Sequence, residues 1–502
     1  MIGQNRSTLV DGMPFFHQDQ RERARGPKMK LLKLDMDRQT PVVNRMWEFG
    51  VNTCHAPLWL RRDLPLQLRE EHETLGFRYV RFHGVLNDDM GVVHADGSFH
   101  FERVIEVYEK TLNAGFRPFI ELSSMPTALA SSDSSVCFYR FISAPPRDWR
   151  KWYDLIHAFT QALTEHFGRE AVREWYFEVW NEPDIPFWEG SMAEYFKLYD
   201  LARRAVKSVC PEYRVGGPAT SKTKWIPEFI THVTTPSADD PEPGIRCDFI
   251  STHAYPSDLA FLDAAEGSVE LQEASILRTL CAAARKEIDQ RLGAGVPLIF
   301  GEWNSSAGPF AFNHDECNNA AFICKTMTEV RASCQGSMYW NATDIYEEND
   351  FHYTPFHGGY GVMNVNSFPK SSFHAFRFLR ETGEMEIAAA FDESCEEHGV
   401  LASRSGDELR LLVWNYRQPG TDGVPLEFRI ADLPAVSGTM ERIEPGHGSA
   451  YETWLELGKP DFLNRQQFDR LAQAAQTTVQ SLKSDQIVTI PSGCAALLKF
   501  RI

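Results

Sequence analysis

At 502 residues the chain is too long for one ordinary domain, but a barrel of about 250–350 residues plus a smaller module would fit. Hydrophobic residues make up 43% and aromatic residues 12%, which is enough for a large core and argues against disorder. The formal net charge is −18, whereas nucleic-acid binders usually present a basic face. DNA and RNA are therefore excluded as expected partners.

The N-terminal sequence has no charged head followed by an apolar stretch of signal-peptide length, and no later segment approaches a membrane span. The ten cysteines are scattered and form no CxxC pair. We therefore expect reduced, mostly buried thiols and no zinc site. These features favour a cytoplasmic location without a membrane partner.

Eight short apolar runs alternate with amphipathic stretches through the middle of the chain, which is typical of a (β/α)₈ barrel. The predicted strands are residues 46–55, 78–83, 117–122, 175–180, 214–218, 248–253, 297–301 and 337–340. The clearest predicted helices are residues 149–167, 193–209, 269–291 and 320–332. A doubly wound open sheet is the alternative, but it would require an early glycine-rich phosphate loop, and none is present.

After about residue 383 the pattern changes to short alternating segments separated by turn residues, such as 408–416, 425–430 and 495–502. Such segments are typical of an antiparallel β-sandwich. We therefore predict an α/β chain in which residues 45–382 form a catalytic TIM barrel and residues 383–502 form an appended C-terminal β-sandwich. Residues 1–44 contain no strong helix, and we expect part of them to pair with the sandwich.

Two acidic motifs, WNEPD at 180–184 and GEWN at 301–304, each follow a predicted buried strand. Barrel enzymes hold their active sites at the C-terminal ends of the strands, so Glu182 and Glu302 would face each other there. In glycoside hydrolysis one such acid protonates the leaving oxygen, and the other attacks the sugar or activates water. We interpret both as candidate catalytic residues, with a surface-loop glutamate as the alternative.

Side chains at other strand ends complete the candidate site. Asn181 can offer its amide to a sugar hydroxyl or can stabilise a turn. His253 and Tyr255 lie two residues apart and so point to one side, although a satisfied core histidine is the alternative for His253. Trp340 can form an apolar floor for a sugar ring or belong to the core. Weaker candidates are His83 and His55, and Glu121 and Glu178 lie inside strands, where we expect structural roles.

Taken in order, these motifs resemble glycoside hydrolase family 39, the family of β-xylosidases and α-L-iduronidases. The segments that carry the resemblance are FRYVRFHG at 77–84, RPFIE at 117–121, FEVWNEPD at 177–184, HAY at 253–255, YW at 339–340, DIYEE at 344–348 and PFHGGYG at 355–361. It covers roughly residues 49–378. Such an ordered set is more specific for the family than for its substrate.

The resemblance implies residue roles. Glu182 would be the acid/base and Glu302 the nucleophile. The implied glycone contacts are Asn181, His253, Tyr255 and Glu347, with Phe187 and Trp340 shaping the subsite. The loop after Pro183 is one residue shorter than in the xylosidases, so the choice between Phe187 and Trp188 stays open. Trp303 stands where many relatives have a tyrosine, which removes a phenol that could hydrogen-bond the nucleophile or the developing oxocarbenium.

The resemblance implies a retaining exo-β-glycosidase, closest to β-xylosidases that hydrolyse xylo-oligosaccharides from the non-reducing end. Tyr255 stands where the iduronidase branch has a basic residue, so a neutral sugar is favoured over a uronate. We expect a small carbohydrate partner and no metal or organic cofactor, and we leave a homo-oligomer open. The alternatives are an endo-acting, β-glucosidase, arabinosidase or uronidase specificity, or a carbohydrate-binding protein on an inactive scaffold.

Overall fold

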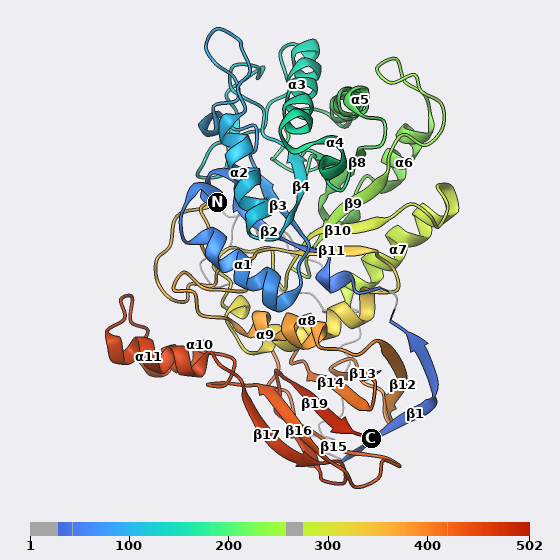
Figure 1. The fold of residues 1–502 in the computed structure, drawn as a ribbon, viewed down its shortest axis with the longest axis vertical. Coiled ribbons are helices and arrows are strands. Elements are labelled where there is room, and N and C mark those ends of the chain that lie inside the picture. Colours follow the sequence, from blue (N-terminus) through green and yellow to red (C-terminus); the bar gives the residue numbers. More distant parts are fainter. Residues whose placement is uncertain (1–28, 43, 258–274, 419) are drawn as a thin grey trace, which may run out of the picture.

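The computed structural model describes residues 29–42, 44–257, 275–418 and 420–502. In these ranges the chain forms a closed eight-stranded barrel and a separate nine-stranded sheet. Figure 1 shows the barrel above and the sheet below, with helices between them. No helix of the described ranges has the length and apolarity needed to cross a bilayer. The first part of the predicted helix 269–291 lies outside the described residues.

The barrel strands are β2 Gly50–His55, β3 Tyr79–His83, β4 Arg117–Leu122, β7 Tyr176–Val179, β8 Arg214–Thr220, β9 Phe249–Ala254, β10 Leu298–Trp303 and β11 Gly336–Tyr339. Each pairs with its neighbour in parallel, and β11 pairs with β2 to close the ring. This arrangement confirms the predicted barrel. The one clear boundary difference is at residues 46–48, which form the short helix η2 before β2 begins.

Large side chains close the N-terminal end of the barrel. They are Phe49, Tyr79, Phe119, Tyr176, Phe249, Ile299 and Met338. Because side chains alternate along each strand, the next inward positions toward the C-terminal end include Arg81 two residues after Tyr79, and Glu121 two residues after Phe119. Polar groups therefore gather at the other end of the barrel, where barrel enzymes hold their sites.

Helices cover the outside of the barrel (Figure 1). They are α1 Leu64–Leu75, α2 Glu102–Asn113, α3 Trp149–Phe167, α4 Arg169–Val172, α5 Met192–Val209, α6 Ile226–Thr234, α7 Ile276–Arg291, α8 Asn318–Val330 and α9 Ser371–Arg380. Helix α3 matches its prediction because Asp148 caps its first turn and Gly168 follows its end. Its buried side chains, among them Trp152, Ile156 and Phe159, recur at helical spacing.

Short elements connect these parts. They are η3 Ala56–Leu60, η4 Asp88–Met90, η5 Ser221–Thr223, η6 Phe312–His314, and the small hairpin of β5 Ser135–Val136 and β6 Phe141–Ile142. The hairpin follows β4 and lies beside the loop after β11, because the amide of Phe138 donates to the carbonyl of Glu348 at 2.6 Å. These loops border the candidate site.

The second sheet runs in the order β17-β16-β19-β14-β13-β12-β1-β15-β18. Its strands are β1 Lys30–Pro41, β12 Met385–Phe391, β13 His398–Ser405, β14 Glu408–Asn415, β15 Leu426–Ile430, β16 Ser437–Ile443, β17 Thr478–Lys483, β18 Val488–Ile490 and β19 Cys494–Arg501. Two helices, α10 Tyr451–Glu456 and α11 Arg465–Ala474, lie between β16 and β17. The sheet is antiparallel except where β1 pairs with β15, and it confirms the predicted appended sandwich.

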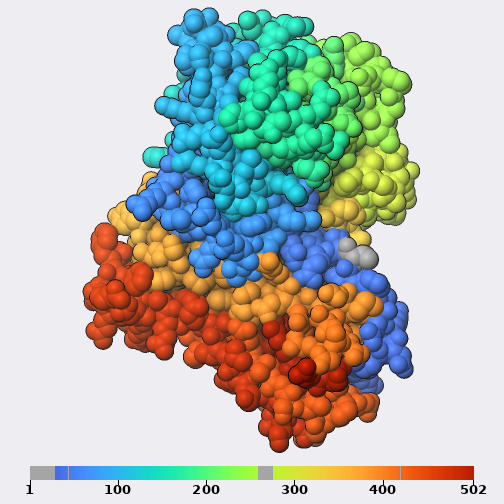
Figure 2. Space-filling model, in the orientation of Figure 1, coloured from blue at the N-terminus to red at the C-terminus, as the bar shows by residue number. Residues whose placement is uncertain are grey.

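Strand β1 lies inside this sheet, although it comes first in the chain. It pairs antiparallel with β12 and parallel with β15. In Figure 2 its blue atoms lie against the orange atoms of the accessory sheet, below the rest of the blue segment. The N-terminal strand therefore connects the two halves of the accessory sheet.

Candidate active site

A register shift in β10 turns Glu302 into the barrel. Upstream of the shift, Phe300 pairs with Thr252 of β9. The residue between Phe300 and Glu302 has no partner in β9, and Glu302 pairs with His253. An extra residue in a strand reverses which face the following side chains take. Glu302 and His253 therefore face the interior together, and Trp303 faces outward.

Glu182 reaches the same end of the barrel through an irregular turn after β7. Trp180 and Glu182 have φ angles of 74° and 41°, in the left-handed region that non-glycine residues rarely adopt. The turn is held by the Glu182 amide, which donates to the Ala219 carbonyl at 2.9 Å. The Trp180 indole also donates to the Phe187 carbonyl at 2.9 Å. Strained backbone of this kind is often found at functional sites.

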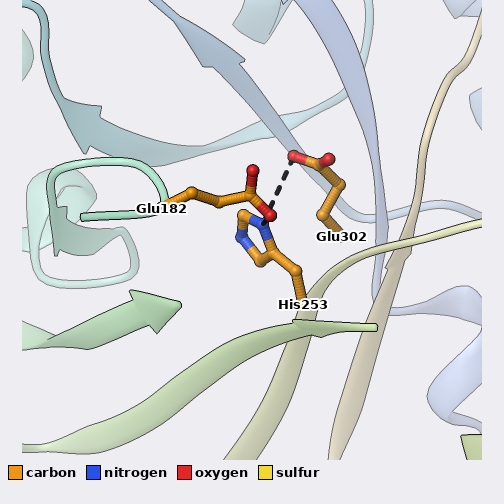
Figure 3. A group of neighbouring side chains, drawn as sticks. All are labelled: Glu182, His253 and Glu302. Carbon is orange, nitrogen blue, oxygen red and sulfur yellow. Dashed lines mark hydrogen bonds and ion pairs between the residues drawn. The ribbon is translucent and has the colours of Figure 1, made fainter. Parts of the chain in front are cut away.

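The two carboxyl groups point toward each other beside the imidazole of His253 (Figure 3). His253 Nδ1 lies 3.0 Å from Glu182 Oε1 and 3.6 Å from Glu302 Oε2. One oxygen of each carboxylate and one His253 ring nitrogen all lie within 4.8 Å of one another. The Tyr255 hydroxyl donates to Glu302 Oε1 at 2.5 Å. The two acids are close enough to act on one bond of one substrate.

Arg81 of β3 offsets negative charge beneath the two acids. Its buried guanidinium lies 2.6 Å from Glu178, 2.7 Å from Glu121 and 3.4 Å from Glu302. It also donates to Asn181 Oδ1 at 2.8 Å and so orients that amide. Burial disfavours the charge on Arg81, but the three carboxylates outweigh it and raise the pKa of Arg81. The Arg81 guanidinium therefore fixes the positions of three carboxylates that come from barrel strands.

The charges around the two acids differ. Burial first, and then the charges of Asp184 and Glu348, raise the pKa of Glu182 to about 8. Burial also raises the pKa of Glu302, but the Arg81 guanidinium works against this increase. Of two neighbouring acids, the one with the cationic partner loses its proton first. At neutral pH this favours an ionised Glu302 and a protonated Glu182.

These groups open into one cavity of about 260 Å³ at the C-terminal ends of the strands. Its lining consists of His83, Asn181, Glu182, Phe187, Tyr255, Glu302, Ala307, Trp340, Glu348 and Tyr360. Seven of these ten are site residues predicted from the sequence. The ring of His83 lies 4.9 Å from that of Trp340, and its Nδ1 lies 2.7 Å from Glu121. The cavity therefore combines aromatic walls with a few fixed polar groups, as small-molecule sites do.

Three predicted residues lie outside this lining. His253 is fully buried behind the two acids and touches both. His55 and Glu347 pair with each other, with His55 Nδ1 at 2.7 Å from Glu347 Oε1. It is Glu348 that faces the cavity. The sequence DIYEE places two glutamates side by side, and nothing in the motif indicates which one turns inward.

The structure shows which of Phe187 and Trp188 lines the cavity. Phe187 lines the cavity, with its ring 6.1 Å from that of His83. Trp188 is buried elsewhere, where its indole donates to the Ser191 carbonyl at 3.1 Å and its ring lies 5.1 Å from Trp180. Trp188 therefore supports the turn that carries the acid.

The sequence-based interpretation of Trp303 is wrong. Its ring packs outside the barrel, 5.1 Å from Tyr339 and 6.2 Å from Phe376 of α9. A tyrosine at this position would face the same way and would not reach the nucleophile. The phenol that contacts Glu302 comes from Tyr255 instead.

Glu182, His253 and Glu302 form the group of potential metal ligands found among the described residues. Each already has a protein partner, because His253 contacts both acids and Glu302 accepts from Tyr255. The Arg81 guanidinium also lies 3.4 Å from Glu302. This donor set is matched to proton transfer and nucleophilic attack more closely than to a cation.

Comparison with known proteins identifies relatives along most of the chain. The model of glycosyl hydrolases family 39 matches residues 30–487. A β-xylosidase from Caldicellulosiruptor saccharolyticus is 37% identical over 469 residues, which cover 89% of this chain and 92% of that protein. A β-xylosidase from Geobacillus stearothermophilus is 33% identical over 463 residues, covering 88% of this chain and 89% of that protein.

A solved structure also matches the whole architecture. The monomeric β-xylosidase from Caulobacter crescentus CB15 superposes with a TM-score of 0.82 at 30% identity. The superposition covers 94% of this chain and 99% of that chain, so it includes both the barrel and the accessory sheet.

Proposed function

The chain belongs to family 39 of the glycosyl hydrolases, and from that premise we propose that it is a retaining exo-β-xylosidase. It removes xylose from the non-reducing end of short xylo-oligosaccharides. The observation that carries this proposal is the placement of Glu182 and Glu302, since one oxygen of each carboxylate lies within 4.8 Å of one oxygen of the other. In retaining glycosidases the two carboxyl groups are about 5–5.5 Å apart, whereas inverting enzymes leave about 6.5–9.5 Å for a water molecule.

The reaction proceeds in two displacements. In the first, Glu302 attacks the anomeric carbon, and Glu182 gives its proton to the departing glycosidic oxygen. This step forms a bond between the sugar and Glu302 and leaves Glu182 ionised. In the second, Glu182 takes a proton from water, and the resulting hydroxide displaces Glu302 from the sugar. Both acids then return to their starting states, and no metal or organic cofactor takes part.

The surroundings of Glu302 suit the first step. Arg81 lies 3.4 Å from one of its oxygens and Tyr255 donates to the other, so the nucleophile is held in one orientation. Asn181, held by Arg81, offers its amide to a hydroxyl of the bound sugar. Fixed groups of this kind lower the barrier because no reorganisation is needed at the moment of reaction.

The cavity supports a single neutral sugar as the glycone. The rings of Phe187 and Trp340 line it beside the two acids, an arrangement that suits one sugar ring. Tyr255 and Glu348 line it, and among the described residues the lining includes no lysine or arginine to pair with a substrate carboxylate. Leaving a uronate unpaired in such a site is costly, so a β-xyloside is favoured over an iduronide.

Replacing each acid separately tests the proposal. Glu302→Ala should abolish turnover of xylobiose and of an activated aryl β-xyloside, because the glycosyl-enzyme bond cannot form. Glu182→Ala should abolish turnover of xylobiose but keep the first step on the aryl substrate, whose leaving group needs little protonation. Glu456→Ala, whose side chain is 64% exposed, is the control and should match the parent enzyme.

Three results would contradict the proposal. Equal losses on both substrates in the Glu182 and Glu302 variants would refute the assigned roles. A product with inverted anomeric configuration, read by proton NMR in the first minutes of the reaction, would refute the retaining mechanism. An aryl iduronide cleaved as efficiently as the aryl xyloside would overturn the substrate class.

The free thiols support a cytoplasmic location for this activity. All ten cysteines are unpaired, and among them only Cys395 is exposed. Burial raises the pKa of several, including Cys54 and Cys324, which keeps these thiols protonated and unreactive. Buried thiols without disulfides are typical of proteins that work in a reducing compartment.

A further inference from the structure

A buried histidine lies behind one wall of the cavity. His314, at the end of η6, is fully buried, and its ring lies 4.8 Å from that of Tyr360, which lines the cavity. Its Nδ1 lies 2.9 Å from the Gly358 carbonyl oxygen, and its Nε2 lies 3.1 Å from that of Ser306. Ser306 and His314 belong to the connection between β10 and α8, whereas Gly358 belongs to the loop after β11. The His314 ring therefore lies where these two connections meet.

A neutral imidazole can donate to only one of the two carbonyl groups. Burial lowers the pKa of His314 to about 4, so at neutral pH its ring carries a proton on one nitrogen. The shorter distance assigns this proton to Nδ1, which then donates to the Gly358 carbonyl. Nε2 faces the Ser306 carbonyl without a proton between them. The bond that joins the two connections is therefore the one from Nδ1 to Gly358.

The Gly358 residue is held on both sides by consecutive residues. Its amide donates to Asp315 at 2.7 Å, and its carbonyl accepts from His314. Gly358 has a φ angle of 77°, and a Cβ atom at this position would lie 2.3 Å from the carbonyl carbon of Phe310. Such a close approach of two backbones requires glycine. The position of residue 358 is therefore set by the connection between β10 and α8.

Tyr360 carries this constraint to the cavity. It follows Gly358 by two residues, and its hydroxyl donates to the carbonyl of Ala307, another lining residue, at 2.8 Å. Its ring lies 6.3 Å from that of Trp340, which also lines the cavity. Tyr360 is thus held by its backbone through Gly358, by its hydroxyl, and by the ring of His314.

We propose that His314 is a positioning residue, which acts through Gly358 and Tyr360 to hold the aromatic wall of the cavity against the bound sugar. The inference rests on the proposed function. Among the described residues, the cavity lining does not include His314, so its effect on the sugar passes through Tyr360. An aromatic ring packs on the C–H face of a pyranose, and that contact is weakened when the ring is no longer fixed.

Three variants of His314 separate the two ring nitrogens. An asparagine amide reaches the place of Nδ1 and can keep the bond to Gly358. A glutamine amide reaches the place of Nε2 and can contact only Ser306, and phenylalanine keeps a ring without either contact. Xylose occupies the cavity without reacting, so its inhibition constant reports binding there.

The expected results follow from the loss of one ring contact. The inhibition constant of xylose should rise about three- to tenfold in His314→Phe and in His314→Gln, whereas His314→Asn should recover most of the loss. On an aryl β-xyloside, kcat/KM should fall by the same factor and kcat should change less, because a contact present in both the bound and the transition state affects binding.

His374→Phe is the matched control. His374 of α9 is also buried, burial also lowers its pKa to about 4, and its Nε2 lies 2.8 Å from the Ala475 carbonyl oxygen in the accessory part of the chain. This variant should lower the midpoint of urea unfolding, as His314→Phe does, and leave the inhibition constant of xylose unchanged. An equal rise of that constant in both phenylalanine variants would show a general loosening of the fold and overturn the positioning role.

The remaining outcomes are distinct. A parent enzyme that neither cleaves an aryl β-xyloside nor binds xylose would refute the proposed function. A parent enzyme that does both, with unchanged constants in His314→Phe and His314→Gln, would refute the role of His314 alone. Equal recovery in His314→Asn and His314→Gln would show that the bond to Gly358 is not the one that acts and would also overturn the proposal. If His314→Phe does not fold, the comparison of the asparagine and glutamine variants decides.

Discussion

The proton on Glu182 depends on the charges around it. Glu302 has a guanidinium and a phenol as partners, whereas Glu182 is buried among other acids. Asp184, two residues away, accepts from the amide and hydroxyl of Ser221 at 2.8 and 2.6 Å. Its charge is thereby fixed in place, and it favours the neutral form of Glu182. A general acid works best when its pKa lies near the working pH.

The pH dependence of the first step should report this acid. Glu182 must hold its proton, and its pKa is about 8, so kcat/KM on xylobiose should fall as the pH rises through about 8. Asp184→Asn removes a negative charge but can still accept from Ser221. It should lower the pKa of Glu182 and move the alkaline limb of the profile to lower pH.

Asp154→Asn, a change at a partly exposed position on α3, should leave that limb in place. The profile is measured as kcat/KM because this quantity reports groups of the free enzyme. An alkaline limb that does not move in Asp184→Asn would show that the charge of Asp184 does not act on Glu182.

At the level of single residues, the sequence indicated the two acids but not the cation between them. WNEPD and GEWN are short motifs after apolar strands, so Glu182 and Glu302 could be found directly. Arg81 lies inside a strand, and its partners Glu121, Glu178 and Glu302 are 40 to 221 residues away. Only closure of the barrel brings them together, and no local pattern encodes that closure.

Among the secondary-structure elements, strands were predictable and loops were not. Buried parallel strands appear as apolar runs because both faces are covered. The register shift in β10, which decides that Glu302 and not Trp303 faces the cavity, leaves no such mark. The conformation of the loop after β11 was also not predictable from the sequence, since its orientation depends on buried charges contributed by distant segments.

A buried ion cluster holds this loop. Lys370, just before α9, lies 2.5 Å from Asp315 and 3.2 Å from Asp344, and it donates to the Gly359 carbonyl at 2.7 Å. Asp315 accepts from the Gly358 amide, and Asp344 from the Gly361 amide, both at 2.7 Å. The cluster therefore fixes residues 358–361, which include the cavity residue Tyr360.

Removal of the Lys370 ammonium group should strongly destabilise the fold. Lys370→Met leaves two fully buried carboxylates without their partner, which should lower the free energy of unfolding by about 3–5 kcal/mol. Lys499→Met, which breaks a partly exposed pair with Glu381, should cost less than about 1 kcal/mol. Urea unfolding, monitored by tryptophan fluorescence, compares the two variants. Similar costs would show that the cluster does not stabilise the fold.

At the scale of the whole molecule, the barrel and the accessory sheet share one apolar core. Helix α8 packs on β14 and β19, and the ring of Phe322 in α8 lies 6.1 Å from Tyr416. Polar contacts cross the same boundary, with Arg377 of α9 at 2.5 Å from Glu441 of β16. Strand β1 adds a covalent connection from the other end of the chain, because it enters the accessory sheet before the barrel begins.

The chain should therefore unfold as one unit, although it has the length of two domains. We propose boundaries of 45–382 for the barrel and 383–502 for the sandwich, and neither part should be stable alone. Separation would expose the apolar faces of α8 and α9 and would leave the accessory sheet without β1. Independent domains give separate transitions, whereas a shared apolar interface couples them.

Calorimetry of the full chain should give a single transition that coincides with loss of activity. The fragment of residues 45–382 should be insoluble or lack a cooperative transition, and a fragment that keeps residues 29–42 without 383–502 should behave no better. Two resolved transitions, or an isolated barrel that unfolds cooperatively and hydrolyses an aryl xyloside, would contradict the coupling. In that case the accessory sheet would be an independent module, and the shared core would contribute little to the stability of the catalytic barrel.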